Sequence, residues 1–538
     1  MHQKHYYFIL IFLFWSVLSC ESQVREVDIL IKGAMVHLGD GSPPSQMDVG
    51  IVGDRISFVG ESETENIQAK RVILGEGYLL SPGFIDVHTH SIDDLLSERV
   101  KANINYLKQG VTTVVTGNDG GGKINVGQML AKMDEQGIGT NAVLMVGHGM
   151  IRKQVMDMSD AEPSAEEMDQ MKSILSQAMK EGAFGMSTGL YYTPGNFAKT
   201  DEVIELAKVA KENGGIYDSH IRDESSYSIG LVEAIKEAIE IGRQSGIHIN
   251  ISHIKALGVD VWGKSEEIIG LIEAAHEEGI SVSADQYPFR ASGTSITNAL
   301  VPRWVFADDF IANMKNPELL PRIKKEMADN LRRRGGPDAL LFTSAQSKEL
   351  YGKTLEEVAE ERGQAIIPAA YLIIMSGGSR VASFNMNPED MHNFMQQDWV
   401  MTSSDGSNGH PRKFASYPKK IREFVKEKSV ISLEEMIRKS TSLPAQIFQI
   451  KDRGQIKEGY FADLILFKLD EIQDKATYAK PEILSEGIWT LIINGEIAIE
   501  KGKYTNVLAG KPLRMNKQKG KITSLAARRK MRIAPTSL

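Results

Sequence analysis

The chain has 538 residues, of which 42% are apolar and 25% are charged, and its formal net charge is −8. These proportions are those of an ordinary folded protein and exclude collagen, coiled coil and disorder as global descriptions. The mild negative charge argues against a nucleic-acid-binding protein. Because Cys20 is the only cysteine, a disulfide framework or a cysteine-rich zinc site within the chain is excluded.

Residues 1–19 are typical of a signal peptide. Lys4 precedes an uncharged run, residues 6–18, that is too short to span a bilayer comfortably. The sequence Val17-Leu-Ser-Cys20 resembles a bacterial lipobox, in which Cys20 is lipidated and becomes the mature N-terminus. An ordinary secretory signal with an incidental cysteine is the alternative. We therefore expect an exported lipoprotein of the bacterial periplasm or cell envelope, attached to a membrane only through this lipid.

Both ends of the remaining chain have the pattern of a small β domain. Short alternating runs punctuated by Gly, Pro and Asp fill residues 25–80, and strand patterns return at 461–467 and 489–496. We therefore predict a β-sandwich domain built from residues 20–80 and 446–515. Residues 516–538 form a basic tail, which is usually solvated.

Between these parts, strand-length apolar runs alternate with helical patterns. The eight predicted strands are 83–90, 111–118, 141–149, 183–190, 215–222, 248–255, 280–288 and 399–405. Helical spacing of apolar residues is clearest at 164–180, 201–213, 228–245 and 265–278. An α/β fold with a (β/α)8 TIM-type barrel over residues 81–445 follows, with an open doubly wound sheet as the alternative. The gap at 289–398 predicts an insertion between barrel strands 7 and 8.

Histidine and aspartate side chains occur where several of these predicted strands end, the position of barrel active sites. They are His88, His90, Asp119, His220, His253 and Asp405. His88 and His90 are two residues apart on one strand, so both imidazoles can face the barrel axis. Each residue alone would be interpreted as a core histidine or a helix cap, but six such residues at the same end of the barrel strands predict a metal site. Imidazole and carboxylate ligands suit Zn²⁺, as one or two ions, and other divalent metals are possible.

The motifs around these residues resemble the amidohydrolase superfamily, and within it the D-aminoacylase (N-acyl-D-amino-acid deacylase) branch. The matching stretches are GFIDVHTH (83–90), VTTVVTGN (111–118), GHGMIR (147–152), STGLYYTPG (187–195), SHIK (252–255), DQYPF (285–289) and SDGSNGHPR (404–412). Members of the branch usually carry Cys after the GN turn, where this chain has Asp119. That departure leaves the identity and number of the metal ions open.

The resemblance implies a role for each metal-site residue. His88 and His90 would hold the more exposed metal position, and His220 and His253 the other. Asp405 would be both a ligand and the general base that activates water, and then the acid that protonates the leaving amine.

The resemblance also implies substrate contacts for Tyr192, Lys255, Tyr287 and Arg412. Arg412 would pair with the α-carboxylate of the substrate, because guanidinium and carboxylate groups match bidentately. For Tyr192 and Tyr287, ordinary aromatic residues of the barrel rim are the alternative reading.

The implied activity is metal-dependent hydrolysis of N-acyl-D-amino acids, a small-molecule substrate. One alternative is another amidohydrolase, such as a dipeptidase or cyclic-amide hydrolase. A second is a non-catalytic, lipid-anchored binding protein, which the retention of all six candidate ligands disfavours. Residues 294–302 contain no basic side chain where acid-specific relatives place one. We therefore expect a substrate whose amino acid is neither D-Glu nor D-Asp.

Overall fold

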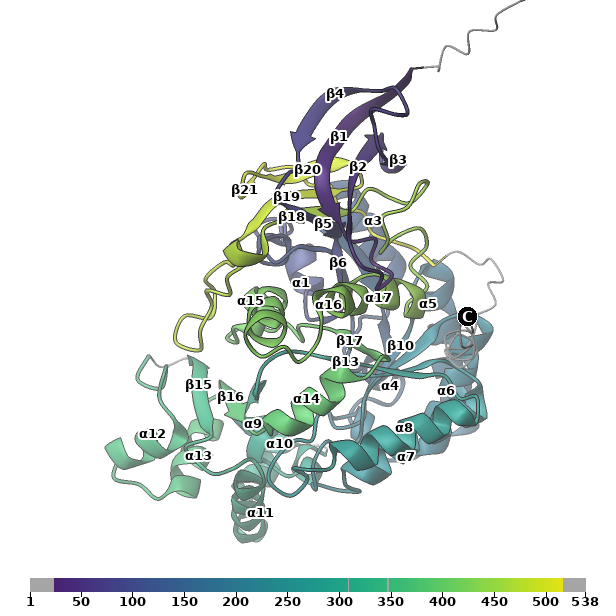
Figure 1. The fold of residues 1–538 in the computed structure, drawn as a ribbon. Helices are drawn as coiled ribbons and strands as arrows, with labels where there is room; N and C mark the ends of the chain where they lie inside the picture. The colour runs from purple at the N-terminus through teal and green to yellow at the C-terminus, as the bar shows by residue number, and fades with distance from the viewer. Residues whose placement is uncertain (1–23, 308, 346–347, 516–538) are drawn as a thin grey trace, which may run out of the picture.

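A computed structural model describes residues 24–307, 309–345 and 348–515 (Figure 1). The predicted signal peptide, Cys20 and the basic tail at 516–538 lie outside these described residues. Within them, no helix combines the length and the apolar character that a bilayer crossing requires. Figure 1 shows a β domain above a barrel, with a third group of elements around β15, β16 and α12 on the opposite side.

The centre of the molecule is the predicted (β/α)8 barrel. Its strands are β6 (Phe84–Thr89), β7 (Val111–Thr116), β8 (Asn141–Leu144), β9 (Val146–Gly147), β10 (Gly185–Gly189), β11 (Ile216–His220), β12 (Ile249–Ile251), β13 (Val282–Gln286) and β17 (Val400–Thr402). The strands form two parallel sheets, one in the order β6-β7-β8 and the other in the order β9-β10-β11-β12-β13-β17. The third predicted strand is interrupted at Met145 between β8 and β9, and a bridge between Thr89 and Gly406 joins β6 to the residues after β17.

Helices surround the barrel, and successive ones pack side by side. The longer ones are α3 (Val126–Gln136), α5 (Ala165–Glu181), α6 (Thr200–Glu212), α7 (Leu231–Ser245), α8 (Ser265–Glu277) and α14 (Pro388–Gln396). Shorter helices are α1 (Ile92–Leu95), α2 (Ile104–Leu107), α4 (His148–Met156), α15 (Arg412–Lys419), the π-helix at Lys420–Glu427, α16 (Leu433–Ser440) and α17 (Ser442–Ile447). Local sequence sets their ends: Ser164 and Glu167 form a capping box at α5, and Gly246 ends α7 in the left-handed conformation.

The β domain joins the two ends of the described chain. Its strands are β1 (Arg25–Val36), β2 (Ser45–Val52), β3 (Arg55–Gly60), β4 (Ile67–Leu74), β5 (Leu79–Pro82), β18 (Leu464–Phe467), β19 (Ile488–Ile493), β20 (Glu496–Glu500) and β21 (Lys503–Tyr504). All belong to one hydrogen-bonded sheet, in which β5 pairs with β1 on one side and with β18 on the other. The sheet wraps around a small core that includes Val49, Leu80 and Leu464.

The segment between β13 and β17 forms a subdomain with its own core. Its elements are β14 (Ala291–Ser295), α9 (Ile296–Leu300), α10 (Phe310–Lys315), α11 (Leu320–Arg333), β15 (Leu340–Ala345), α12 (Leu355–Glu361), α13 (Ile366–Met375) and β16 (Ser379–Phe384). The three strands form an antiparallel sheet in the order β14-β16-β15, which packs on a separate apolar cluster. α14, the last part of the predicted insertion, packs against α8 as a barrel helix.

A buried ion pair connects the barrel to the β domain. Arg453 pairs with Asp463, and both side chains are buried. Asp463 also accepts a hydrogen bond from Asn141 at the start of β8 (3.1 Å) and one from the backbone N–H of Asn494 (2.8 Å). The network thus fixes the end of the β19 strand against the bottom of the barrel.

Replacing Asp463 by Ala leaves the Arg453 guanidinium buried without its counter-charge. We expect Asp463→Ala to lower the free energy of unfolding by about 3–5 kcal/mol. Urea unfolding followed by circular dichroism measures the change. Glu233→Ala is the control, because its exposed pair with Lys236 contributes at most about 1 kcal/mol. Equal stability of the two variants would contradict this role for the ion pair.

Candidate active site

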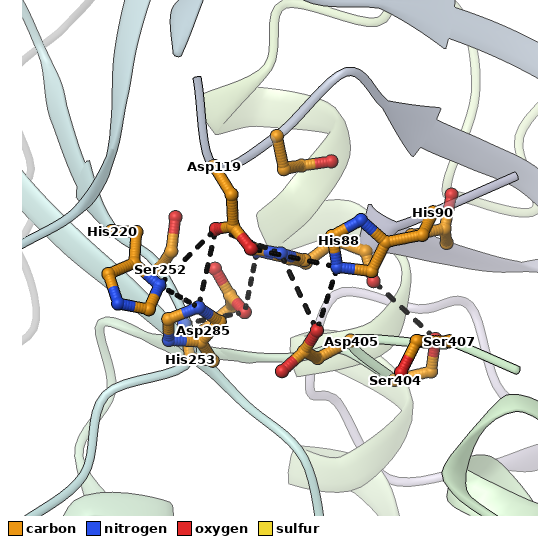
Figure 2. A network of polar contacts seen from close by, with 12 residues as sticks. His88, His90, Asp119, His220, Ser252, His253, Asp285, Ser404, Asp405 and Ser407 are labelled. Carbon is orange, nitrogen blue, oxygen red and sulfur yellow. Dashed lines mark hydrogen bonds and ion pairs between the residues drawn. The ribbon is translucent and has the colours of Figure 1, made fainter. Parts of the chain in front are cut away.

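The predicted metal-site residues converge at the carboxyl ends of the barrel strands (Figure 2). His88 is in β6 and His220 ends β11, whereas Asp119, His253 and Asp405 lie just beyond β7, β12 and β17. The backbone of these last three residues is left-handed, with φ of 57°, 37° and 47°. Such a conformation is uncommon for residues other than glycine and is frequent at functional sites, where it directs side chains.

Asp119 lies at the centre of the group (Figure 2). Its Oδ1 is 3.4 Å from His88 Nε2, 3.6 Å from His220 Nδ1 and 3.4 Å from His253 Nε2. Its other oxygen, Oδ2, is 3.6 Å from Nε2 of His90. One carboxylate therefore contacts all four imidazoles.

Asp405 completes the side of the site nearest the solvent. Its Oδ1 is 3.1 Å from His90 Nε2 and 3.8 Å from His88 Nε2. His90 is the most open of the six residues, with a side chain that is 37% exposed. This is the side on which the more exposed metal position was predicted.

The six residues fit a divalent metal centre. Their ligand atoms form two groups that share Asp119, one with His88, His90 and Asp405 and one with His220 and His253, and within each group the atoms lie within 4.8 Å of one another. Tetrahedral ligands at Zn–N and Zn–O distances would lie roughly 3.3 Å apart, close to the separations seen here. His88 Nε2 and Asp119 Oδ1 are buried and have no hydrogen-bond partner among the described residues, as expected of atoms that coordinate an ion.

Two carboxylates, Asp285 and Asp218, are buried behind the metal-site residues and hold their neighbours in position. Asp285 is fully buried, accepts the backbone N–H of His253 at 3.0 Å and lies 4.0 Å from His88 Nδ1. Asp218, also buried, accepts hydrogen bonds from Asn118 and Ser252 at 2.9 Å each. These carboxylates fix the backbone of His253 and the side chains beside the metal-site residues, which helps to hold the site in place.

The electrostatics of the group favour a bound cation. Burial lowers the pKa of His88 and opposes its charge, but the carboxylates of Asp119, Asp405 and Asp285 outweigh burial and raise the pKa to about 10. Burial would raise the pKa of Asp405, but Arg412 outweighs it and holds that pKa well below its ordinary value. The site therefore concentrates negative charge that a divalent ion would neutralise.

Five of the six metal-site residues, all except His88, line a cavity of about 530 Å³. All four predicted substrate-binding residues line it: Tyr192, Lys255, Tyr287 and Arg412. The Tyr287 hydroxyl is buried and has no hydrogen-bond partner in the described part of the chain, so it is available to a ligand. Lys255 is less free than predicted, because its Nζ pairs with Glu224 and lies 2.7 Å from His253 Nδ1.

Arg412 is held next to the predicted general base. It is 1% exposed, and its Nη1 is 2.8 Å from Asp405 Oδ2. Its guanidinium lies over the Tyr287 ring, 4.7 Å from the centroid. Arg412 therefore contacts the metal-site carboxylate as well as the cavity in which a substrate would lie.

Sequence reasoning missed three charged residues of the cavity wall: Glu224, Arg334 and Arg380. Glu224 follows His220 by four residues in a loop, and the arginines come from the insertion. Arg334 lies just after α11 and Arg380 lies on β16, so both arginines reach the cavity from outside residues 294–302. The expectation against an acidic D-amino acid stays a prediction.

The comparisons with known proteins agree with this geometry. The chain is 30% identical over 520 residues to a D-aminoacylase from Alcaligenes xylosoxydans xylosoxydans, covering 92% of this chain and 99% of the relative. A solved structure describing the binuclear metal centre of D-aminoacylase superposes with a TM-score of 0.78, at 29% identity over 91% of this chain and 100% of that one. N-acyl-D-glutamate deacylase from Bordetella bronchiseptica, solved with zinc and a phosphonate inhibitor, gives 0.77 at 28% identity, again over 91% and 100%. The Amidohydrolase family matches residues 79–498, from β5 into β20, and the chain belongs to that family.

Proposed function

We propose that this amidohydrolase removes the acyl group from N-acyl-D-amino acids with the help of Zn²⁺ or a similar divalent ion. The observation that carries the proposal is the position of Asp119, which joins two groups of metal ligands directly below a cavity that contains Asp405 and Arg412. The activities named for the D-aminoacylase and the N-acyl-D-glutamate deacylase support the same reaction class.

When bound, a divalent ion polarises an amide carbonyl and makes water a better nucleophile at neutral pH. The residues of the chain supply the remaining chemistry. Asp405 is ionised at neutral pH because its pKa is depressed, so its carboxylate can accept a proton from the attacking water. The same carboxyl group then returns that proton to the leaving nitrogen.

The cavity orients the substrate next to the metal-site residues. Arg412 offers a positive charge to the α-carboxylate next to the scissile amide, and the free hydroxyl of Tyr287 lies on the same wall. Holding the substrate between these groups and the metal ligands fixes the carbonyl carbon near the attacking water, which lowers the entropic cost of the reaction.

Loss of one inner histidine tests the metal centre. We expect His220→Ala to lose bound metal and to lower kcat/KM by more than about 100-fold, because it deletes a ligand rather than an outer contact. Metal is measured by mass spectrometry on dialysed protein. The matched control is His248→Gln. His248 is also a buried histidine, but it precedes β12 and so lies at the opposite end of that strand from the metal-site residue His253. Full metal content in His220→Ala would contradict the assignment.

Asp405→Asn tests the proton transfer. The amide keeps the shape of the side chain but cannot accept the proton, so we expect kcat to fall by about 10²- to 10⁴-fold. Metal bound through Asp119, His220 and His253 should remain. Steady-state kinetics together with metal analysis separate the two effects. A kcat near that of the wild type would mean that another group carries the proton.

We also propose that the protein is a lipoprotein of the bacterial cell envelope, on the basis of the lipobox pattern that ends at Cys20. Mass spectrometry of the mature N-terminus should find a lipidated Cys20. In Cys20→Ser the lipid should be absent and the protein should move from the membrane fraction to the aqueous fraction. A wild-type N-terminus without lipid would overturn this proposal and leave the enzymatic one untouched.

A further inference from the structure

Arg380 is a cation of the cavity wall that forms no ion pair with the residues that the structure describes. It lies on β16 of the insertion, is partly buried and lines the cavity. Its Nη2 donates a hydrogen bond to Ser407 Oγ at 3.0 Å. Among the described residues, no carboxylate lies within ion-pair distance of its guanidinium, whereas Lys255 and Arg412 on the same wall have Glu224 and Asp405.

Arg412 approaches the same hydroxyl. Its Nη2 donates to Ser407 Oγ at 3.3 Å, so two guanidinium groups converge on one oxygen atom. Asp405 forms an ion pair with Arg412, and no carboxylate of the described residues forms one with Arg380. The Nη1 group of Arg412 faces Asp405, whereas its Nε group, although buried, has no hydrogen-bond acceptor in the described part of the chain.

The insertion brings the two arginines together. β14 and β16 are paired so that Arg380 lies opposite Ser295 and Ala382 lies opposite Gly293. A Cβ atom on Gly293 would lie 3.2 Å from Arg412 Nη2, so the absence of a side chain there lets β14 pack closely against this guanidinium. Barrel and insertion therefore each supply one arginine to the same end of the cavity.

Two adjacent guanidinium groups repel each other and leave N–H donors without acceptors unless an anion lies between them. A carboxylate matches this arrangement, because each of its oxygens can accept from one guanidinium. The place is next to Asp405 and the metal ligands, where the group adjoining a scissile amide would lie.

We propose that Arg380 and Arg412 form a two-arginine clamp that binds the free α-carboxylate of the substrate. The proposal rests on the proposed function and extends it by a specificity-determining residue, Arg380. The clamp selects substrates whose carboxylate adjoins the scissile amide and discriminates against amides and longer peptides, which lack the charge at this position.

The test compares wild type, Arg380→Gln and Arg380→Lys in their zinc-loaded forms. The substrates are N-acetyl-D-leucine, N-acetyl-D-glutamate and the uncharged N-acetyl-D-leucine amide. Loss of a charge-assisted contact should lower kcat/KM by about 10- to 100-fold for Arg380→Gln, mainly through KM, and equally for both acids. The amide should be unaffected, and Arg380→Lys should fall in between. Calorimetry with the same compounds reports binding without turnover.

Arg332→Gln is the control, because Arg332 is an exposed arginine of the same subdomain that pairs with Asp260 outside the cavity. It should behave as wild type with all three compounds. The clamp is refuted if Arg380→Gln lowers kcat/KM only for N-acetyl-D-glutamate, because Arg380 would then bind the side-chain carboxylate. The clamp is also refuted if Arg380→Gln lowers kcat/KM equally for the amide, or if the wild type binds the acids and the amide with the same affinity. A wild type that binds the acids tightly but hydrolyses none of them would overturn the proposed function alone.

Discussion

The burial of the Asp119 carboxylate among four imidazoles is the constraint on which the site depends. A carboxylate in this place needs positive charge around it, and the imidazoles can supply it either as protonated groups or as fellow ligands of a cation. The strands beneath carry two further buried carboxylates: Asp285 accepts the backbone N–H of His253, and Asp218 holds the side chain of Asn118. The negative charge of the barrel mouth thus favours a bound cation next to Asp119.

The insertion supplies positive charge that balances the negative charge of the site. The barrel presents acids and imidazoles, whereas Arg334 and Arg380 reach the cavity from the insertion. Arg412 connects the two parts, since it lies next to Asp405 and donates to the hydroxyl that also accepts from Arg380. The cavity is therefore lined by arginines on the side of the insertion and by the metal-site residues on the side of the barrel.

The barrel could be predicted from the sequence because each strand is a short, continuous apolar run that ends in a polar residue. The six metal-site residues could be predicted for the same reason, since strand ends meet at one level. The interruption at Met145 was not predictable, because the apolar run continues through it and only the change of partner from β7 to β10 separates β8 from β9. The position of Arg380 could not be predicted, because it depends on the pairing of β14 with β16 and not on the alternation of strands and helices in the barrel.

The pairing of the two chain ends has a consequence for how the protein folds. Leu80 pairs with Leu466, and Thr89 bridges Gly406, so the β domain and the ring of barrel strands both close through contacts between distant parts of the chain. Closing such long loops carries a large entropic cost before any contact is gained, and topologies of this kind fold slowly. During synthesis, β1 to β5 therefore leave the ribosome long before β18, the late partner of β5, and the core that they share with Leu464 and Leu466 is completed only when the last part of the chain arrives.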